Sequence, residues 1–244
     1  MTIRHWVACR CLALATTSLL AHPAFSQDFG RYEGTVQTEW LEDGRKMRLL
    51  APFTYYDHKG RKWDAPKDWV VDGASIPQVA WTFSGGPYEG KYRNASVVHD
   101  VGCDRKAQPW EDVHEVFYYG MLASGVEPWR AKIMYAAVYH FGPRWPRFVE
   151  VRDKTWRPRD VVPPHTVGAV KGSTAMVVAS GSRAISGNDG NGSKTEKVAV
   201  VAINPPEKKF TAADFEELKG RIEASSATDS VSLQEIRNFV PTKQ

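Results

Sequence analysis

Segments rich in β-forming residues, separated by polar turn residues, occupy the chain from residue 28 to about residue 72. The segments GTVQTEW and KMRLLAPFTYY are rich in β-forming residues and flank an Asp-Gly pair. That pair favours a hairpin, because glycine tolerates the positive φ of a tight turn. A second turn at residues 57–60 leads into RKWDAPKDWVVDGAS, where Pro66 predicts an edge strand or a break. The pattern predicts an antiparallel meander of three or four strands.

Beyond residue 92, apolar residues recur with the spacing typical of helices. A first helix is expected over 92–102. A second is expected over 110–124, because Pro109 precedes it and two carboxylates occupy its first turn, where they suit the helix dipole. A third begins at Pro128 and ends at Gly142-Pro143. Strands followed by helices, without alternation, predict an α+β fold in which the meander packs against about three helices.

Composition divides the remainder of the chain. Residues 163–197 are rich in Gly, Ser, Asn and Pro and are expected to form a flexible linker after a core domain at 28–160. Residues 198–244 are expected to hold a short strand, KVAVVAINPP, and a helical hairpin. Its two helices have capping-box signatures at Thr211–Asp214 and Ser232–Glu235. So short a pair cannot bury both faces alone, so it should dock on the core domain or on a partner.

Residues 1–26 have the layout of a secretory signal peptide. Arg4 and Arg10 precede the apolar stretch CLALATTSLLA, and Ala24-Phe25-Ser26 is a small-residue cleavage site. Cleavage is expected near Ser26 or Gln27, which makes the protein periplasmic or secreted. The alternative is an uncleaved anchor, although the apolar part is short for a membrane span. No other segment is long and apolar enough to be transmembrane.

Export changes the charge and the cysteine count. The formal net charge is +4, and loss of Arg4 and Arg10 leaves +2. So modest a basicity, together with export, argues against nucleic acid as a partner. Cys9 and Cys11 leave with the signal peptide, so Cys103 remains alone and no intramolecular disulfide framework is possible.

The stretch SVVHDVGCD at 96–104 places His99 and Asp100 side by side in an apolar run, which is costly unless partners satisfy them. His114 follows fifteen residues later on the next predicted helix, and Asp72 ends a predicted strand. If the helices are antiparallel, these four side chains converge. The alternatives are a satisfied core histidine at His114 and a turn-capping role for Asp72, with Ser75 capping a helix that begins at the following Ile-Pro.

Two imidazoles and a carboxylate are ligands that zinc and other divalent metals use. We therefore consider Asp72, His99 and His114 as metal ligands or water-polarising groups, with Asp100 orienting an imidazole or acting as general base. Cys103 lies one turn after His99 and could form an activated thiolate, although a buried, inert cysteine is commoner. We rank that thiolate below the metal.

Several of these segments together resemble the bacterial and phage family named domain of unknown function 1353, over roughly residues 30–148. The matching positions are Asp72, Ala74, Ser75, Ile76, Pro77, Ala95, His99 and Asp100. The chain departs from the family in having Val-Gly-Cys after His-Asp instead of a Leu-Tyr pair, and His114 where many members carry Asp. The resemblance implies a small α+β domain and a link to the cell envelope or to virion parts.

Two functions remain open from the sequence. One is an exported, metal-assisted hydrolase acting on an envelope component such as peptidoglycan, through Asp72, His99, Asp100 and His114. The other is a non-catalytic binding or assembly module in which the His-Asp pair is a structural polar network, and the C-terminal helices engage a partner. The aromatic and basic run FGPRWPRF is expected to be a turn with Arg144 and Arg147 in solvent, or else a surface for a polymer or membrane.

Overall fold

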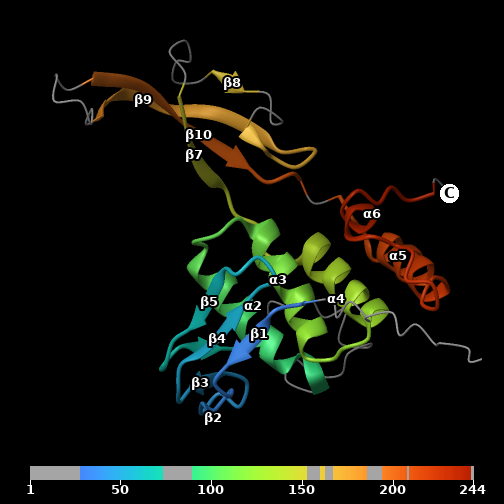
Figure 1. The fold of residues 1–244 in the computed structure, drawn as a ribbon. Coiled ribbons are helices and arrows are strands. Elements are labelled where there is room, and N and C mark those ends of the chain that lie inside the picture. Colours follow the sequence, from blue (N-terminus) through green and yellow to red (C-terminus); the bar gives the residue numbers. More distant parts are fainter. Residues whose placement is uncertain are drawn as a thin grey trace, which may run out of the picture.

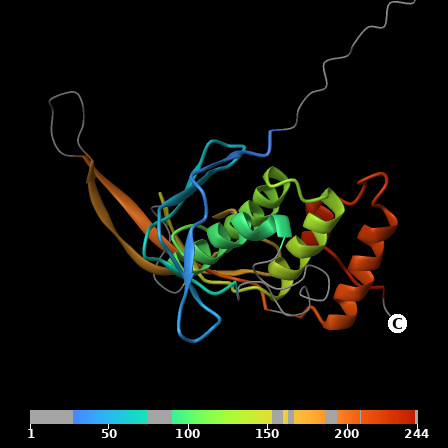
Figure 2. The ribbon, with the colours of Figure 1, turned by 90° about the horizontal axis from the view of Figure 1, so that it is seen from below.

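The computed structural model describes residues 28–73, 90–152, 160–162, 167–185, 194–207 and 209–242. The expected α+β class is confirmed. A helical layer lies between short N-terminal strands on one side and two C-terminal helices on the other (Figure 1). A separate four-stranded sheet lies beyond one end of the helices (Figures 1 and 2).

The N-terminal strands form two three-stranded antiparallel sheets instead of one meander. The first has the order β1-β4-β5, and its strands are Arg31–Glu33, Phe53–Tyr56 and Lys62–Ala65. The second has the order β2-β3-β6, and its strands are Thr38–Trp40, Met47–Leu49 and Val70–Val71. Both expected hairpins are present, β2–β3 and β4–β5. The two sheets separate at the bend between β3 and β4, where Pro52 has no amide hydrogen to donate to a strand ladder.

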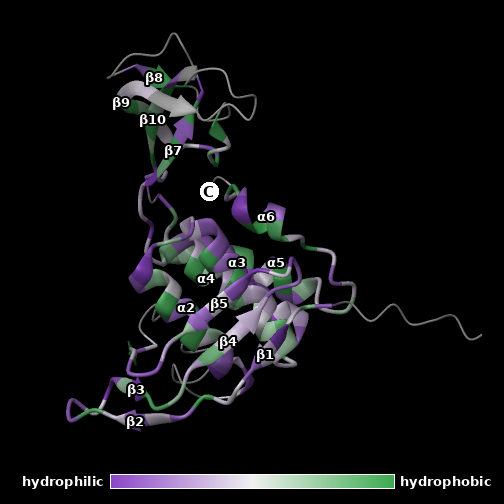
Figure 3. Cartoon of the chain, turned by 60° about the vertical axis from the view of Figure 1, so that its left-hand side comes forward, coloured by the Kyte–Doolittle hydropathy of each residue, from purple (hydrophilic) through white to green (hydrophobic). Residues whose placement is uncertain are grey.

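Three helices form the centre of the molecule, as expected. They are α2 (Arg93–Arg105, preceded by the 3-10 turn η1 at Gly90–Tyr92), α3 (Trp110–Ala123) and α4 (Pro128–Phe141). Hydrophobic stretches mark α3 and α4 (Figure 3). No helix in the described ranges is long and apolar enough to cross a membrane.

Small residues let α2 and α3 approach closely. A Cβ atom added to Gly102 of α2 would lie 2.8 Å from Cγ1 of Val113 on α3. At the other end of the contact, a Cβ on Gly120 of α3 would lie 3.1 Å from Cβ of Ala95 on α2. The helices are therefore antiparallel, and residues midway between these pairs are brought into contact.

The linker expected at 163–197 contains regular structure instead. Residues Thr174–Ile185 form β9, which pairs antiparallel with β10, Lys194–Asn204. With β7 (Arg147–Val151) and β8 (Val161–Val162) they make a sheet of order β7-β10-β9-β8. Composition hid this hairpin, because Ser180, Gly181 and Ser182 give its second half the composition of a linker, although Ala175 and Val177 in its first half are buried in a small second core. The strand expected at KVAVVAINPP is part of β10.

The C-terminal helices dock on α4. They are α5 (Ala212–Ala224) and α6 (Leu233–Arg237), and each begins with the expected capping box. Their buried apolar side chains belong to the main hydrophobic core: Phe215, Leu218, Ile222 and Ile236. Two polar contacts fix the position, since His140 Nε2 donates to the Ile236 carbonyl (2.8 Å) and Lys132 pairs with Asp229 (2.6 Å). Of the two expected docking sites, the helices thus use the core domain.

Replacing Gly102 by alanine tests the close helix contact. Helix propensity alone favours the substitution by about 1 kcal/mol. The new methyl group would overlap the rigid, fully buried Val113, and overpacking costs about 1–3 kcal/mol. We expect Gly102→Ala to lower the free energy of unfolding by about 1 kcal/mol, measured by urea denaturation.

Gly220→Ala is the matched control, because Gly220 is also helical but nothing lies within 4 Å of its added Cβ. It should raise the free energy of unfolding by about 0.5–1 kcal/mol. Equal stabilisation by both substitutions would contradict the close approach of α2 and α3.

Candidate functional site

The contact between α2 and α3 brings His99 and His114 together. Their side chains have no exposed surface, and His99 Nε2 lies 2.8 Å from His114 Nδ1. The His99 ring also packs against Phe117, with ring centroids 4.9 Å apart. The sequence spacing of fifteen residues therefore does place the two imidazoles in one cluster, as the antiparallel arrangement requires.

The hydrogen bonds define the proton positions of this pair. The Pro143 carbonyl can only accept, so His114 Nε2, at 3.1 Å, carries a proton and donates to it. Nδ1 of His114 then faces His99 with its lone pair. Burial lowers the pKa of His99 to about 3, so this imidazole is neutral at ordinary pH. His99 Nε2 donates to His114 in that state.

Asp100 contacts the chain beside the N-terminal strands. It is 3% exposed, and its Oδ2 accepts a hydrogen bond of 2.6 Å from the amide of Gly73. This contact ties α2 to the chain just after β6. Asp100 is adjacent to His99 in sequence, but successive residues of a helix face different directions. The expected role of Asp100 in orienting an imidazole or acting as general base stays a prediction, whereas its bond to Gly73 is a structural contact.

Asp72 lies at the surface. Its side chain is 34% exposed and forms an ion pair with Arg45, at 3.6 Å. The donor atoms that gather within 4.8 Å of one another belong to His99, Cys103 and His114, without Asp72. Cys103 Sγ lies 3.7 Å from His99 Nε2. Of the expected metal ligands, the structure thus unites the two histidines and adds the cysteine. Ser75 lies outside the described residues.

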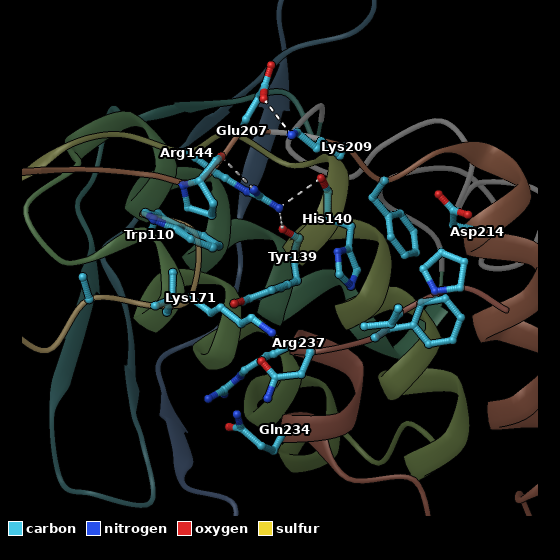
Figure 4. Close-up of a pocket in the computed structure, with 18 residues that line it drawn as sticks. Trp110, Tyr139, His140, Arg144, Lys171, Glu207, Lys209, Asp214, Gln234 and Arg237 are labelled. Carbon is cyan, nitrogen blue, oxygen red and sulfur yellow. Dashed lines mark hydrogen bonds and ion pairs between the residues drawn. The ribbon is translucent and has the colours of Figure 1, made fainter. Parts of the chain in front are cut away.

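A separate pocket lies between the end of α4, the segment before β9 and the C-terminal segment that follows β10 (Figure 4). Its volume is about 640 Å³. Its charged lining side chains are four cations and two carboxylates: Arg144, Lys171, Lys209, Arg237, Glu207 and Asp214. Aromatic rings line it as well, among them Trp110, Tyr139 and Phe210. The arrangement suits a ligand that carries negative charge and has some apolar surface.

Arg144 was expected in solvent, but it lies in the wall of the pocket. It is partly buried, and its guanidinium lies 4.8 Å from the ring centroid of Trp110. Its terminal nitrogens donate to the carbonyls of Tyr139 and Pro206, which holds the cation rigidly in the pocket wall. Arg147 is also partly buried and donates to the Gly168 carbonyl. The aromatic and basic composition of FGPRWPRF was the available signal, but the segments that complete the pocket are distant in sequence.

One segment of the chain is similar to a known family. Residues 47–138 match the model of the family described as protein of unknown function (DUF1353). The match confirms the resemblance of this segment, which contains β3–β6, α2, α3 and most of α4. The histidine pair, Asp100 and Cys103 lie within it, whereas most residues of the pocket lie beyond its end.

Two proteins of Sinorhizobium fredii are similar to this chain. The uncharacterized protein y4jT is 42% identical over 128 residues, which are 52% of this chain and 38% of that protein. The uncharacterized protein y4iH is 47% identical over 103 residues, which are 42% of this chain and 43% of that protein. The chain thus aligns with less than half the length of these curated relatives. No solved structure matches it.

The bond from Gly73 to Asp100 can be tested by substitution. Asp100→Ala would leave a buried amide without this acceptor, which costs about 2 kcal/mol of unfolding free energy. Asp100→Asn keeps a carbonyl oxygen and should cost less. Glu39→Ala removes an exposed carboxylate that pairs with Arg48 and should change stability by less than about 1 kcal/mol. Equal effects of the two alanine variants in urea denaturation would contradict a structural role for Asp100.

His140 should make the protein less stable in acid. Burial is the main cause that lowers its folded-state pKa to about 4, compared with 6.5 for an exposed histidine. The unfolded chain therefore binds the extra proton between these values, so stability falls as the pH drops from about 6.5 to about 4. The loss is about 3 kcal/mol.

Glutamine at this position retains a donor for the Ile236 carbonyl but does not titrate. The free energy of unfolding of His140→Gln should therefore fall less steeply than that of the wild type over this pH range. Parallel curves for the two proteins would exclude His140 as the source.

Proposed function

We propose that the protein is an exported, non-catalytic binding module, and that the pocket beside α4 and α6 takes a carboxylate-bearing polymer of the cell envelope. The proposal rests on the composition of the pocket lining. Four cationic side chains and two carboxylates line the pocket, together with aromatic rings. One of the carboxylates, Glu207, already pairs with Lys209 at 3.3 Å. Arg237 also pairs with a carboxylate, Glu115, at 2.6 Å, so the remaining excess of positive charge rests on Arg144 and Lys171. This excess favours an anionic ligand.

The rigidity of part of the lining supports binding. Arg144 is held by backbone carbonyls and by Trp110, and Arg237 is held by Tyr135 and Glu115. Cations fixed in this way lose little side-chain entropy when a ligand arrives. Lys171 and Lys209 are exposed and can adjust to the ligand.

The burial of the histidine pair argues for a module over a hydrolase. A general base must reach the proton that it abstracts, and His99 and His114 have no exposed surface. His114 and Asp100 contact backbone groups of neighbouring segments, which is the behaviour of a network that fixes helices in place. The expected export supports a ligand in the envelope.

An exposed apolar row on the four-stranded sheet agrees with a binding role. Phe148 lies opposite Ala202, Ala202 lies opposite Met176, and Met176 lies opposite Val161 on the four neighbouring strands. Phe148, Met176 and Val161 are 65%, 43% and 77% exposed. Apolar residues aligned on a surface commonly mark sites of interaction.

Sedimentation with purified peptidoglycan, whose peptides carry carboxylates, tests the proposal. We expect the protein to pellet with the polymer and to be released by salt, because screening weakens exposed charge pairs. The double variant Lys171→Glu/Lys209→Glu should bind about tenfold more weakly, a loss of about 1.4 kcal/mol. Lys67→Glu is the control, because it reverses the charge of an exposed lysine that does not line the pocket and lies in the turn before β6. It should bind like the wild type.

Failure of the wild type to pellet, or equal weakening by Lys67→Glu, would refute the pocket as the binding site. Release of soluble fragments from the polymer by the wild type would instead support the hydrolase. Measuring both the pellet and the soluble fraction thus separates the two functions.

A further inference from the structure

We propose that His99, Cys103 and His114 bind a thiophilic divalent metal ion of the zinc type, which fastens α2 to α3. The three potential ligand atoms are His99 Nε2, Cys103 Sγ and His114 Nδ1, all within 4.8 Å of one another. Imidazole nitrogen and thiolate sulfur are the ligands that zinc takes in proteins. The inference concerns a site separate from the pocket and does not depend on the proposed function.

The spacing of the donor atoms is close to that of a metal site. Zinc lies about 2.3 Å from sulfur and about 2.1 Å from nitrogen, so a tetrahedral site separates the two ligand atoms by about 3.6 Å. Cys103 Sγ and His99 Nε2 are 3.7 Å apart. The two histidine nitrogens are 2.8 Å apart and would separate by about half an ångström to admit the ion between them.

The chain positions these donors before any ion arrives. His99 and Cys103 are four residues apart on α2, so they share one face of the helix. The Pro143 carbonyl accepts from His114 Nε2, which leaves Nδ1 as the ligand atom and fixes the ring. A hydrogen bond from the second ring nitrogen to a carbonyl is a common support of metal-binding histidines.

Burial favours a structural role for the ion. His99 and His114 are 0% exposed and Cys103 is 5% exposed, so the donor atoms are closed to solvent. Structural zinc sites are shielded from solvent and have four ligands, of which this cluster supplies three. Binding would displace the Cys103 thiol proton to solvent, and the resulting thiolate would offset part of the charge of the ion. The neutral His99 ring would carry its proton on Nδ1 in the bound state, which frees the Nε2 that donates to His114 in the metal-free protein. The three donors leave one tetrahedral position for a further ligand.

This ligand set differs from the sequence expectation in one place. Cys103 replaces Asp72, whose carboxylate lies at the surface beside Arg45. The difference can be tested directly, because a thiolate ligand gives a spectroscopic signal that a carboxylate does not.

Titration of the purified, reduced protein with Co²⁺, a spectroscopic substitute for Zn²⁺, tests the site. We expect a thiolate-to-cobalt charge-transfer band that saturates at equimolar metal and disappears on addition of Zn²⁺. The thermal unfolding midpoint should rise with Zn²⁺, because an ion bound only to the folded state stabilises it. Cys103→Ala should abolish the band and the rise in midpoint.

Variants distinguish loss of the site from loss of the fold. Cys103→Ala removes only a small buried group, and its circular dichroism should match that of the wild type. His140→Gln changes a buried histidine outside the cluster and should keep the cobalt band. Absence of the band from the folded wild type, or its persistence in Cys103→Ala, would overturn the proposal. Loss of the band in His140→Gln would overturn the assignment to this cluster.

Discussion

The close approach of α2 and α3 is the constraint on which the centre of the structure depends. Gly102 and the Ala95–Gly120 contact keep the two helix surfaces free of bulky side chains at both ends of their contact. Only at that separation can the imidazoles of His99 and His114 share a hydrogen bond in the interior. The polar pair and the small residues therefore depend on one another, since a wider spacing would leave His99 Nε2 and His114 Nδ1 without their mutual hydrogen bond.

From this helix pair, polar contacts extend to each neighbouring layer. Asp100 binds the backbone after β6, His114 binds the turn after α4, and His140 binds the backbone of α6. Each side chain contacts a main-chain group of a different segment. Because a backbone group is present whatever the side chain is, such contacts fix the arrangement of elements with little demand on the sequence of the partner segment. The C-terminal helices, too short to be stable alone, become part of the main core in this way.

Features set by neighbouring residues could be predicted from the sequence, whereas features set by distant contacts could not. The capping boxes at Thr211 and Ser232 and the starts of α3 and α4 follow from local chemistry and are found where expected. The pairing of His99 with His114 followed from helix spacing. The β9–β10 hairpin was missed because its Gly- and Ser-rich composition is typical of linkers, and only the pairing of the two strands buries Val177 and Val201. The sequence shows that Asp72 ends a strand, but the direction of its side chain depends on tertiary contacts. Its position beside Arg45, away from the cluster of His99, Cys103 and His114, could therefore not be predicted.

The segment that matches the family contains one candidate site and excludes most of the other. Residues 47–138 contain the whole histidine and cysteine cluster, but they contribute only Trp110 to the pocket. The pocket is completed by the turn after α4, by the segment before β9 and by the C-terminal extension. A core that holds its polar groups inside can serve as a scaffold, and segments added to it can create a binding surface without disturbing its packing. The buried cluster thus lies inside the segment that matches the family, whereas nearly all of the pocket is built from residues outside that segment.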